Sequence, residues 1–160
     1  MLDKLTTEEK EFSNTFQPIE IPEKKERRYL PTLSELLDRL SIVQLKEAFI
    51  PEHKEEYAKE IKDIIYDIDI ILKENNINIS AKILRAIIVV AQANTHIWYN
   101  ESRARQGDRK GNDLLYTHTI NGVRARGKDK IQELINGRKD FKFDCLAAEF
   151  SQWEPSWNDD

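Results

Sequence analysis

The chain has 160 residues, of which 39% are hydrophobic and 34% are charged, and its net charge is −4. This length and composition are typical of one compact domain with a buried core. The negative net charge excludes a global electrostatic attraction to nucleic acid or to anionic lipid. A single cysteine, Cys145, excludes an intrachain disulfide and a cysteine-rich zinc site.

The sequence gives no sign of a membrane protein or of a secreted one. No apolar run approaches the roughly 20 residues that a membrane-spanning helix needs. The first residues, MLDKLTTEEKEF, are charged and do not resemble a signal sequence. We therefore expect a cytoplasmic protein that has no membrane partner and no strong nucleic-acid signal.

Residues 1–30 are polar and are interrupted by Pro18 and Pro22. Such a segment is predicted to form a flexible or surface-draped arm before the folded domain.

Two helices are expected after this arm. Thr32 and Glu35 have the spacing of a capping box, and the first helix must end before Pro51. A second helix is predicted over about 52–73, before an asparagine-rich break. Apolar residues recur at helical spacing in both segments: Leu33, Leu36, Leu40 and Val43 in the first, and Tyr57, Ile61, Ile64, Ile68 and Leu72 in the second.

The third helix, predicted over 81–106 with Ser80 as its N-cap, changes character along its length. Its inward stripe starts with Ile83, Ile87 and Val90. The next positions of the same stripe are polar or amphipathic: Asn94, Trp98, Glu101 and Arg105. Because burying an unpaired charge costs several kcal/mol, this stripe indicates either an internal charge network or a ligand pocket.

A fourth helix is expected after the polar turn 107–111, with Asn112 or Asp113 as its N-cap, an end near Asn136 and Gly137 as its stop. Its apolar face is again interrupted by polar residues. Arg124 lies within that face, and His118 and Asn121 lie beside it.

The last segment, 138–160, is predicted to form a short docked helix and an exposed terminus that contains Trp153 and Trp157. The expected fold is therefore all-α, a four- to five-helix bundle over 31–137. A polar N-terminal arm precedes this bundle, and a short C-terminal helix and tail follow it.

If the third and fourth helices pack as an antiparallel pair, their polar residues meet in one pocket. Arginine and asparagine donors then outnumber the acceptors of Glu101, which favours an anion such as phosphate. His118 and Glu101 are the candidate acid–base groups. The candidate ligand-binding residues are Asn94, Trp98, Arg105, Asn121 and Arg124. The alternative is a buried ion pair of Glu101 with Arg105 or Arg124 that fixes helix register without a ligand.

Carboxylates suggest a possible metal site. Asp38 lies on a secondary apolar stripe of the first helix, and the second helix carries an acidic arc of Glu56, Glu60, Asp63 and Asp67. Because neighbouring like charges repel, this arrangement favours a cation. Asp38, Glu60 and Asp63 are the candidate ligands for Mg²⁺, and a solvated acidic face is the alternative.

Three segments carry a resemblance to known proteins: DRLSI at 38–42 with Lys46, NTHIWYNESRAR at 94–105, and TINGVR at 119–124. They resemble a family of uncharacterised small helical proteins of T4-like tailed phages and cyanophages. More distantly, they are similar to a helical domain of unassigned function beside bacterial glycosyltransferases, which has Trp-x-x-Glu…Arg and Asn-x-x-Arg motifs. The residues that match these motifs are Trp98, Glu101, Arg105, Asn121 and Arg124.

This resemblance covers about residues 31–135 and implies a phage accessory protein with a shared helical fold, acting in the cytoplasm of the infected host cell. It implies no particular activity, and the distant relative has an acidic residue where this chain has His118.

Three functions follow as hypotheses. The first is binding of a phosphate-bearing small molecule, such as a nucleotide or nucleotide-sugar, between the third and fourth helices. The second is a Mg²⁺-dependent nucleotide pyrophosphatase or phosphoesterase. The third is a structural or regulatory interaction module that uses the tryptophan-containing tail. Second apolar stripes on the first two helices also predict a homodimer; they contain Ile42, Leu45 and Phe49, and Tyr66 and Ile70.

Overall fold

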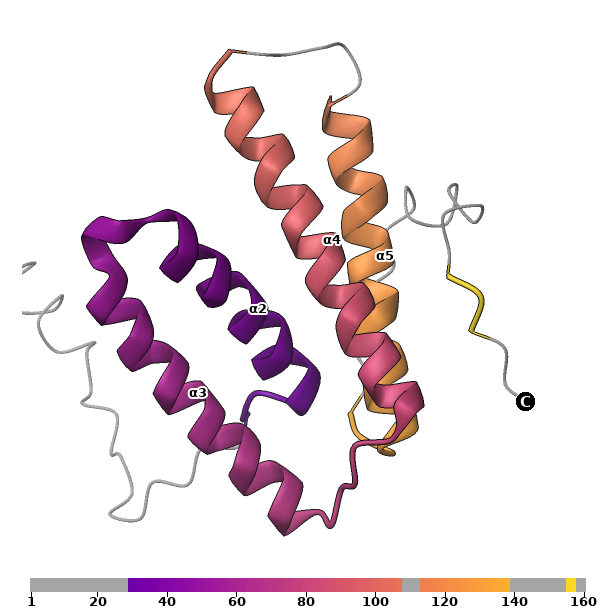
Figure 1. Cartoon of the computed structure of the whole chain (residues 1–160). Helices are drawn as coiled ribbons and strands as arrows, with labels where there is room; N and C mark the ends of the chain where they lie inside the picture. Colours follow the sequence, from indigo (N-terminus) through magenta and orange to yellow (C-terminus); the bar gives the residue numbers. More distant parts are fainter. Residues whose placement is uncertain (1–28, 108–112, 139–154, 158–160) are drawn as a thin grey trace, which may run out of the picture. The chain divides into compact units, whose positions relative to one another are not determined.

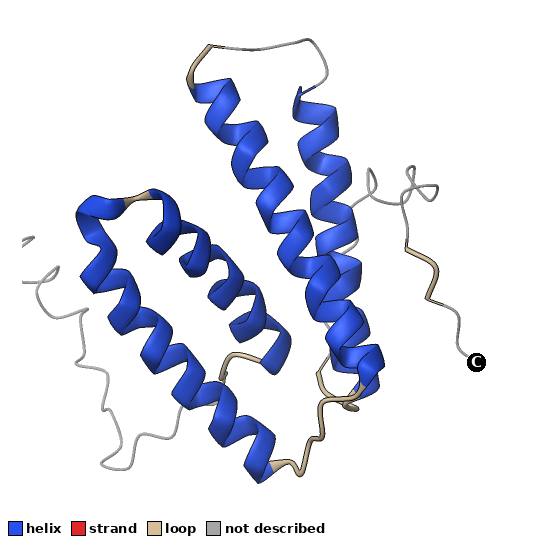
Figure 2. Cartoon of the chain, in the orientation of Figure 1, coloured by secondary structure: helices blue, strands red, loops and turns tan. Residues whose placement is uncertain are grey.

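The computed structural model describes residues 29–107, 113–138 and 155–157. The chain divides into two units, Met1–Leu30 and Pro31–Asp160. The described helices all lie in the second unit: α2 (Leu33–Phe49), the short 3-10 helix η1 (Pro51–His53), α3 (Lys54–Glu74), α4 (Ala81–Arg105) and α5 (Asp113–Leu134) (Figure 1). The described residues contain no β-strand (Figure 2), so the all-α fold is confirmed.

Local capping interactions set the helix starts that the sequence predicted. At α2, the Thr32 hydroxyl accepts a hydrogen bond from the Glu35 N–H at 3.3 Å, and the Glu35 carboxylate accepts one from the Thr32 N–H at 2.7 Å. This is the expected capping box. At α4, the Ser80 hydroxyl accepts a hydrogen bond from the Ile83 N–H at 3.3 Å.

Two helices end in the same way, through an asparagine with a left-handed backbone. Asn76 after α3 has φ 50°, and Asn136 after α5 has φ 54°. In each case the next residue donates its N–H back across the turn, from Ile77 to the Leu72 carbonyl at 2.9 Å and from Gly137 to the Gln132 carbonyl at 2.8 Å. These are Schellman motifs. Asn136, and not the predicted Gly137, therefore occupies the left-handed position that ends α5.

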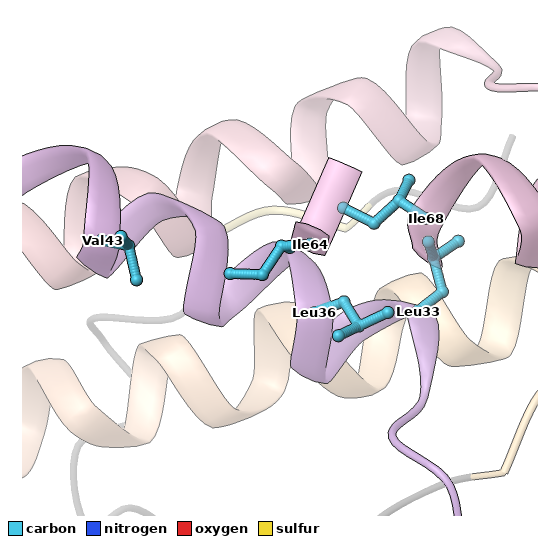
Figure 3. Close-up of a cluster of buried hydrophobic side chains, with 5 residues drawn as sticks. All are labelled: Leu33, Leu36, Val43, Ile64 and Ile68. Carbon is cyan, nitrogen blue, oxygen red and sulfur yellow. The ribbon is translucent and has the colours of Figure 1, made fainter. Parts of the chain in front are cut away.

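The helices form two antiparallel hairpins, α2 with α3 and α4 with α5 (Figure 1). Each hairpin has its own buried apolar cluster, and the partly buried Leu37 packs against both of them. The α4–α5 cluster consists of Ala86, Val90 and Ile131. Figure 3 shows the α2–α3 cluster: Leu33, Leu36, Val43, Ile64 and Ile68. None of the helices in the described residues is long and apolar enough to cross a membrane.

Helices α4 and α5 approach each other closely at Gly127. A Cβ atom built there would lie 2.9 Å from Cγ2 of Val90, a side chain that is itself almost fully buried. Glycine lowers the intrinsic helix propensity of α5. Its presence at position 127 is explained by the close approach of α4, which leaves no room for a Cβ atom.

The described part of the C-terminal tail is docked by Trp157. Its ring packs against the α4–α5 cluster, and the Arg85 guanidinium lies 5.5 Å from the ring centroid. The prediction of an exposed terminus is therefore wrong for Trp157, whose large apolar surface is partly buried on the bundle. Trp153 and the predicted short helix after residue 138 lie outside the described residues, as does most of the predicted arm at 1–30.

Candidate functional site

Part of the surface on which α2 meets the α4–α5 hairpin is polar. Helix α5 contributes Arg124, Lys128 and Gln132, which recur every four residues and so share one face of the helix. At one end of this face, the Gln132 side-chain oxygen accepts a hydrogen bond from the Ser34 N–H at 3.2 Å. This N–H belongs to the first turn of α2 and has no partner within the helix. The polar face of α5 therefore helps to seat α2.

Asp38 of α2 lies at the centre of this contact, with only 11% of its side chain exposed. The Asn94 amide nitrogen donates to the Asp38 carboxylate at 2.7 Å and to the Ser41 hydroxyl at 2.7 Å. The Asn94 amide oxygen accepts a hydrogen bond from Nη1 of Arg124 at 3.3 Å. One asparagine thus links three helices, which explains how an amide is accommodated in the buried stripe of α4.

Two cations approach the Asp38 carboxylate. Nε of Arg124 lies 3.7 Å from one of its oxygens, and Nζ of Lys128 lies 3.5 Å from the other. Both distances are longer than the 2.7–2.9 Å typical of a charge-assisted hydrogen bond. The cationic side chains are 28% and 20% exposed, respectively. The cluster therefore holds two loosely paired positive charges and one carboxylate, at the boundary between interior and solvent.

A second carboxylate, Glu35, adjoins this cluster and has a perturbed pKa. The backbone N–H of Thr32 hydrogen-bonds to the carboxylate and lowers the pKa of Glu35 below its usual range, against the opposing effect of partial burial. The Thr32 hydroxyl and the charges of Lys128 and Arg138 lower this pKa further. Arg138 lies 3.6 Å from the Glu35 carboxylate. Glu35 therefore pairs with Arg138 at the edge of the cluster, and Arg124 and Lys128 face Asp38.

The structure brings together only part of the predicted ligand site. Asn94 and Arg124 are hydrogen-bonded, but Glu101 and Arg105 are 53% and 83% exposed and pair with each other at 3.5 Å on the surface of α4. The reason is the length of α2, which ends at Phe49, where its ring meets that of Tyr99. The last turn of α4 therefore lies beyond the helix that buries Asn94.

The remaining predicted residues are half-buried. Trp98 lies on α4, one turn after Asn94, and both His118 and Asn121 lie on α5. Asn121 is one turn before Arg124, on the side of the helix that carries the polar face.

Sequence reasoning missed Lys128 and Ser41 as members of the site. The position of Lys128, four residues after Arg124, was the available signal for it.

The candidate metal ligands do not come together. Asp38 faces the cations of α5, whereas Glu60 of α3 binds Arg39, with Nε of the arginine 2.7 Å from the carboxylate. Asp63 is exposed. Among the residues that the structure describes, there is no group of three or more His, Cys, Asp or Glu side chains that could hold a metal ion.

Comparison of the chain with protein-family models, with curated proteins and with solved structures gives no match.

Proposed function

We propose that this protein binds a phosphate-bearing small molecule of the nucleotide type, with its anion held by Arg124 and Lys128 where α2, α4 and α5 meet. The observation that carries the proposal is the uncompensated positive charge of the Asp38 cluster. Two partly buried cations that share one carboxylate at 3.5 to 3.7 Å have donors left for another anion.

The geometry of Arg124 supports this proposal. Its Nε faces Asp38 and its Nη1 bonds to Asn94, which leaves Nη2 outside these contacts. A planar guanidinium that is fixed on one edge presents its other donors in a defined direction, as recognition of a phosphate oxygen requires. In this proposal, Asn121 contributes a further polar group and Trp98 an apolar wall.

The proposal modifies the site that the sequence predicted. The proposed site contains Asn94, Arg124 and, in addition, Lys128. It does not contain Glu101 or Arg105, which form an exposed ion pair on the surface of α4. We do not propose a Mg²⁺-dependent hydrolase, because the carboxylates predicted to bind the metal do not lie together and Asp38 pairs with Arg124 and Lys128. A phage accessory role, with the phosphate-bearing ligand drawn from a nucleotide pool, is part of the proposal through the sequence resemblance alone.

The test is calorimetric titration with a panel of nucleotides, cyclic nucleotides, dinucleotides and nucleotide-sugars. Arg124→Lys keeps the charge but loses the guanidinium fork, and we expect it to weaken binding by about 1.5–3 kcal/mol, the contribution of a hydrogen bond to a charged group. Arg105→Lys is the matched control, because it makes the same change at an exposed arginine and should leave affinity unchanged. Absence of binding across the panel to a folded wild-type protein would refute the proposal.

A further inference from the structure

Asp38 is an internal anion in the proposed anion site. Its carboxylate lies within 3.7 Å of both Arg124 and Lys128, and the Asn94 amide holds it in place at 2.7 Å. Any anion bound by these cations must share them with Asp38. The residual charge that the site offers to a ligand is therefore about one positive unit, given two cations and one carboxylate.

The net charge of a ligand affects its binding in two opposing ways. Its attraction to the site grows in proportion to its charge, whereas the cost of removing it from water grows approximately with the square of that charge. Arg124 and Lys128 are mostly buried, so a ligand that reaches them loses part of its hydration. The second negative charge of a ligand thus adds more desolvation free energy than the first, whereas its attraction to the residual positive charge of the site is no greater.

We infer that Asp38 makes this site selective for a singly charged phosphodiester, as in a cyclic nucleotide or a dinucleotide, over a doubly charged phosphate monoester. This inference rests on the proposed function and specifies its ligand class. Because a polymeric phosphodiester would encounter the overall charge of −4, the inference concerns a small molecule and not nucleic acid.

The decisive comparison uses two small probes, dimethyl phosphate with one charge and methyl phosphate, which is predominantly doubly charged at pH 7.5 because its second pKa is about 6. Chemical-shift titration of the side-chain N–H signals of Arg124 gives both dissociation constants. We expect the diester to bind the wild-type protein at least about tenfold more tightly than the monoester. In Asp38→Asn, which has a similar shape but no charge, this preference should disappear or invert.

Glu35→Gln provides a second variant that preserves the capping interaction, because glutamine also accepts a hydrogen bond from the Thr32 N–H. It removes a carboxylate that acts on Lys128, so the preference for the diester should fall in the same direction but by less. Glu101→Gln removes an exposed carboxylate outside the site and should leave the preference unchanged. If Asp38→Asn does not fold, this pair of variants decides the question.

The outcomes separate the two proposals. Failure of the wild type and of every folded variant to bind either probe refutes the proposed function. Two results overturn the inference and leave the proposed function standing. The first is that the wild type binds both probes but prefers the monoester. The second is that the preference for the diester is unchanged in Asp38→Asn or, if that variant does not fold, in Glu35→Gln. The affinity of the wild-type protein for a single-stranded oligonucleotide is also measured and expressed per phosphate group. If it exceeds the affinity for dimethyl phosphate, the small-molecule assignment is overturned.

Discussion

At the scale of single residues, buried polar side chains of this protein are matched by specific partners. Asn94 is almost fully buried, yet its amide bonds to Asp38, Ser41 and Arg124. Gln132 likewise bonds to the Ser34 N–H and to the carbonyl of Arg138. An unmatched buried polar group costs about 1–3 kcal/mol, so these contacts strongly constrain how α2 meets the other two helices.

Glu35 leads to a prediction about pH. Its folded-state pKa is depressed, so its contribution to stability is fully present above the ordinary glutamate pKa of about 4.3 and is lost as the pH falls through the lower folded-state value. The wild type should therefore be more stable than Glu35→Gln at neutral pH, and this difference should vanish in acid.

Urea unfolding of both proteins from neutral pH to about pH 2.5 measures this difference in the free energy of unfolding. Subtracting the two curves removes the contributions of the carboxylates that the proteins share. Glu101→Gln, at an exposed site, is the control for the loss of a surface carboxylate. A difference for Glu35→Gln that persists at the lowest pH would contradict the assignment of the stabilisation to its charge.

At the scale of elements, the contact between α4 and α5 depends on the missing side chain of Gly127. Gly127→Ala gains about 1 kcal/mol in helix propensity but forces a methyl group to 2.9 Å from the buried Val90. We expect steric strain to exceed this gain, with a net loss of about 1–2 kcal/mol in the free energy of unfolding.

Thermal and urea unfolding measure the effect of Gly127→Ala on the free energy of unfolding. The same substitution is then made in a Val90→Ala background. Removing the methyl groups of Val90 makes room at the contact, so Gly127→Ala should be less destabilising, or even stabilising, in the Val90→Ala background. Equal effects in the two backgrounds would show that Val90 is not the obstacle.

At the scale of the whole molecule, the exposed apolar side chains bear on association. Several large ones lie on α2, α3 and α4: Phe49, Ile65, Tyr66, Leu84, Ile88 and Tyr99. Of the second stripes that predicted a homodimer, Ile42, Leu45 and Ile70 are half-buried, whereas Phe49 and Tyr66 are exposed. Scattered apolar residues are normal on protein surfaces, so the homodimer stays a prediction.

Sedimentation equilibrium measures the association. We expect a dimer that Tyr66→Glu weakens at least about tenfold, because it places a charge in an apolar contact. Ala125→Glu, at an exposed position of α5, a helix that carries none of these side chains, is the control for added charge. A wild type that remains monomeric at high protein concentration would refute the prediction.

Local sequence is sufficient to predict the features that depend on near neighbours in the chain. Helix starts at Thr32 and Ser80 follow from side-chain hydrogen bonds that span three residues, and the apolar spacing of α2 and α3 fixes which faces pack together. The polar positions of α4 and α5 could also be recognised, because a polar residue in an apolar stripe is visible without a structure.

Which of these polar positions meet depends on the packing of the helices. Helical periodicity places Asn94 and Glu101 on one stripe, but α2 covers the first and ends before it can cover the second. The sequence suggests a metal at Asp38 because the partners of this carboxylate in the structure, Arg124 and Lys128, lie more than eighty residues away in the chain. Whether a carboxylate faces a metal, a cation or water depends on the crossing of distant helices, which local spacing does not specify.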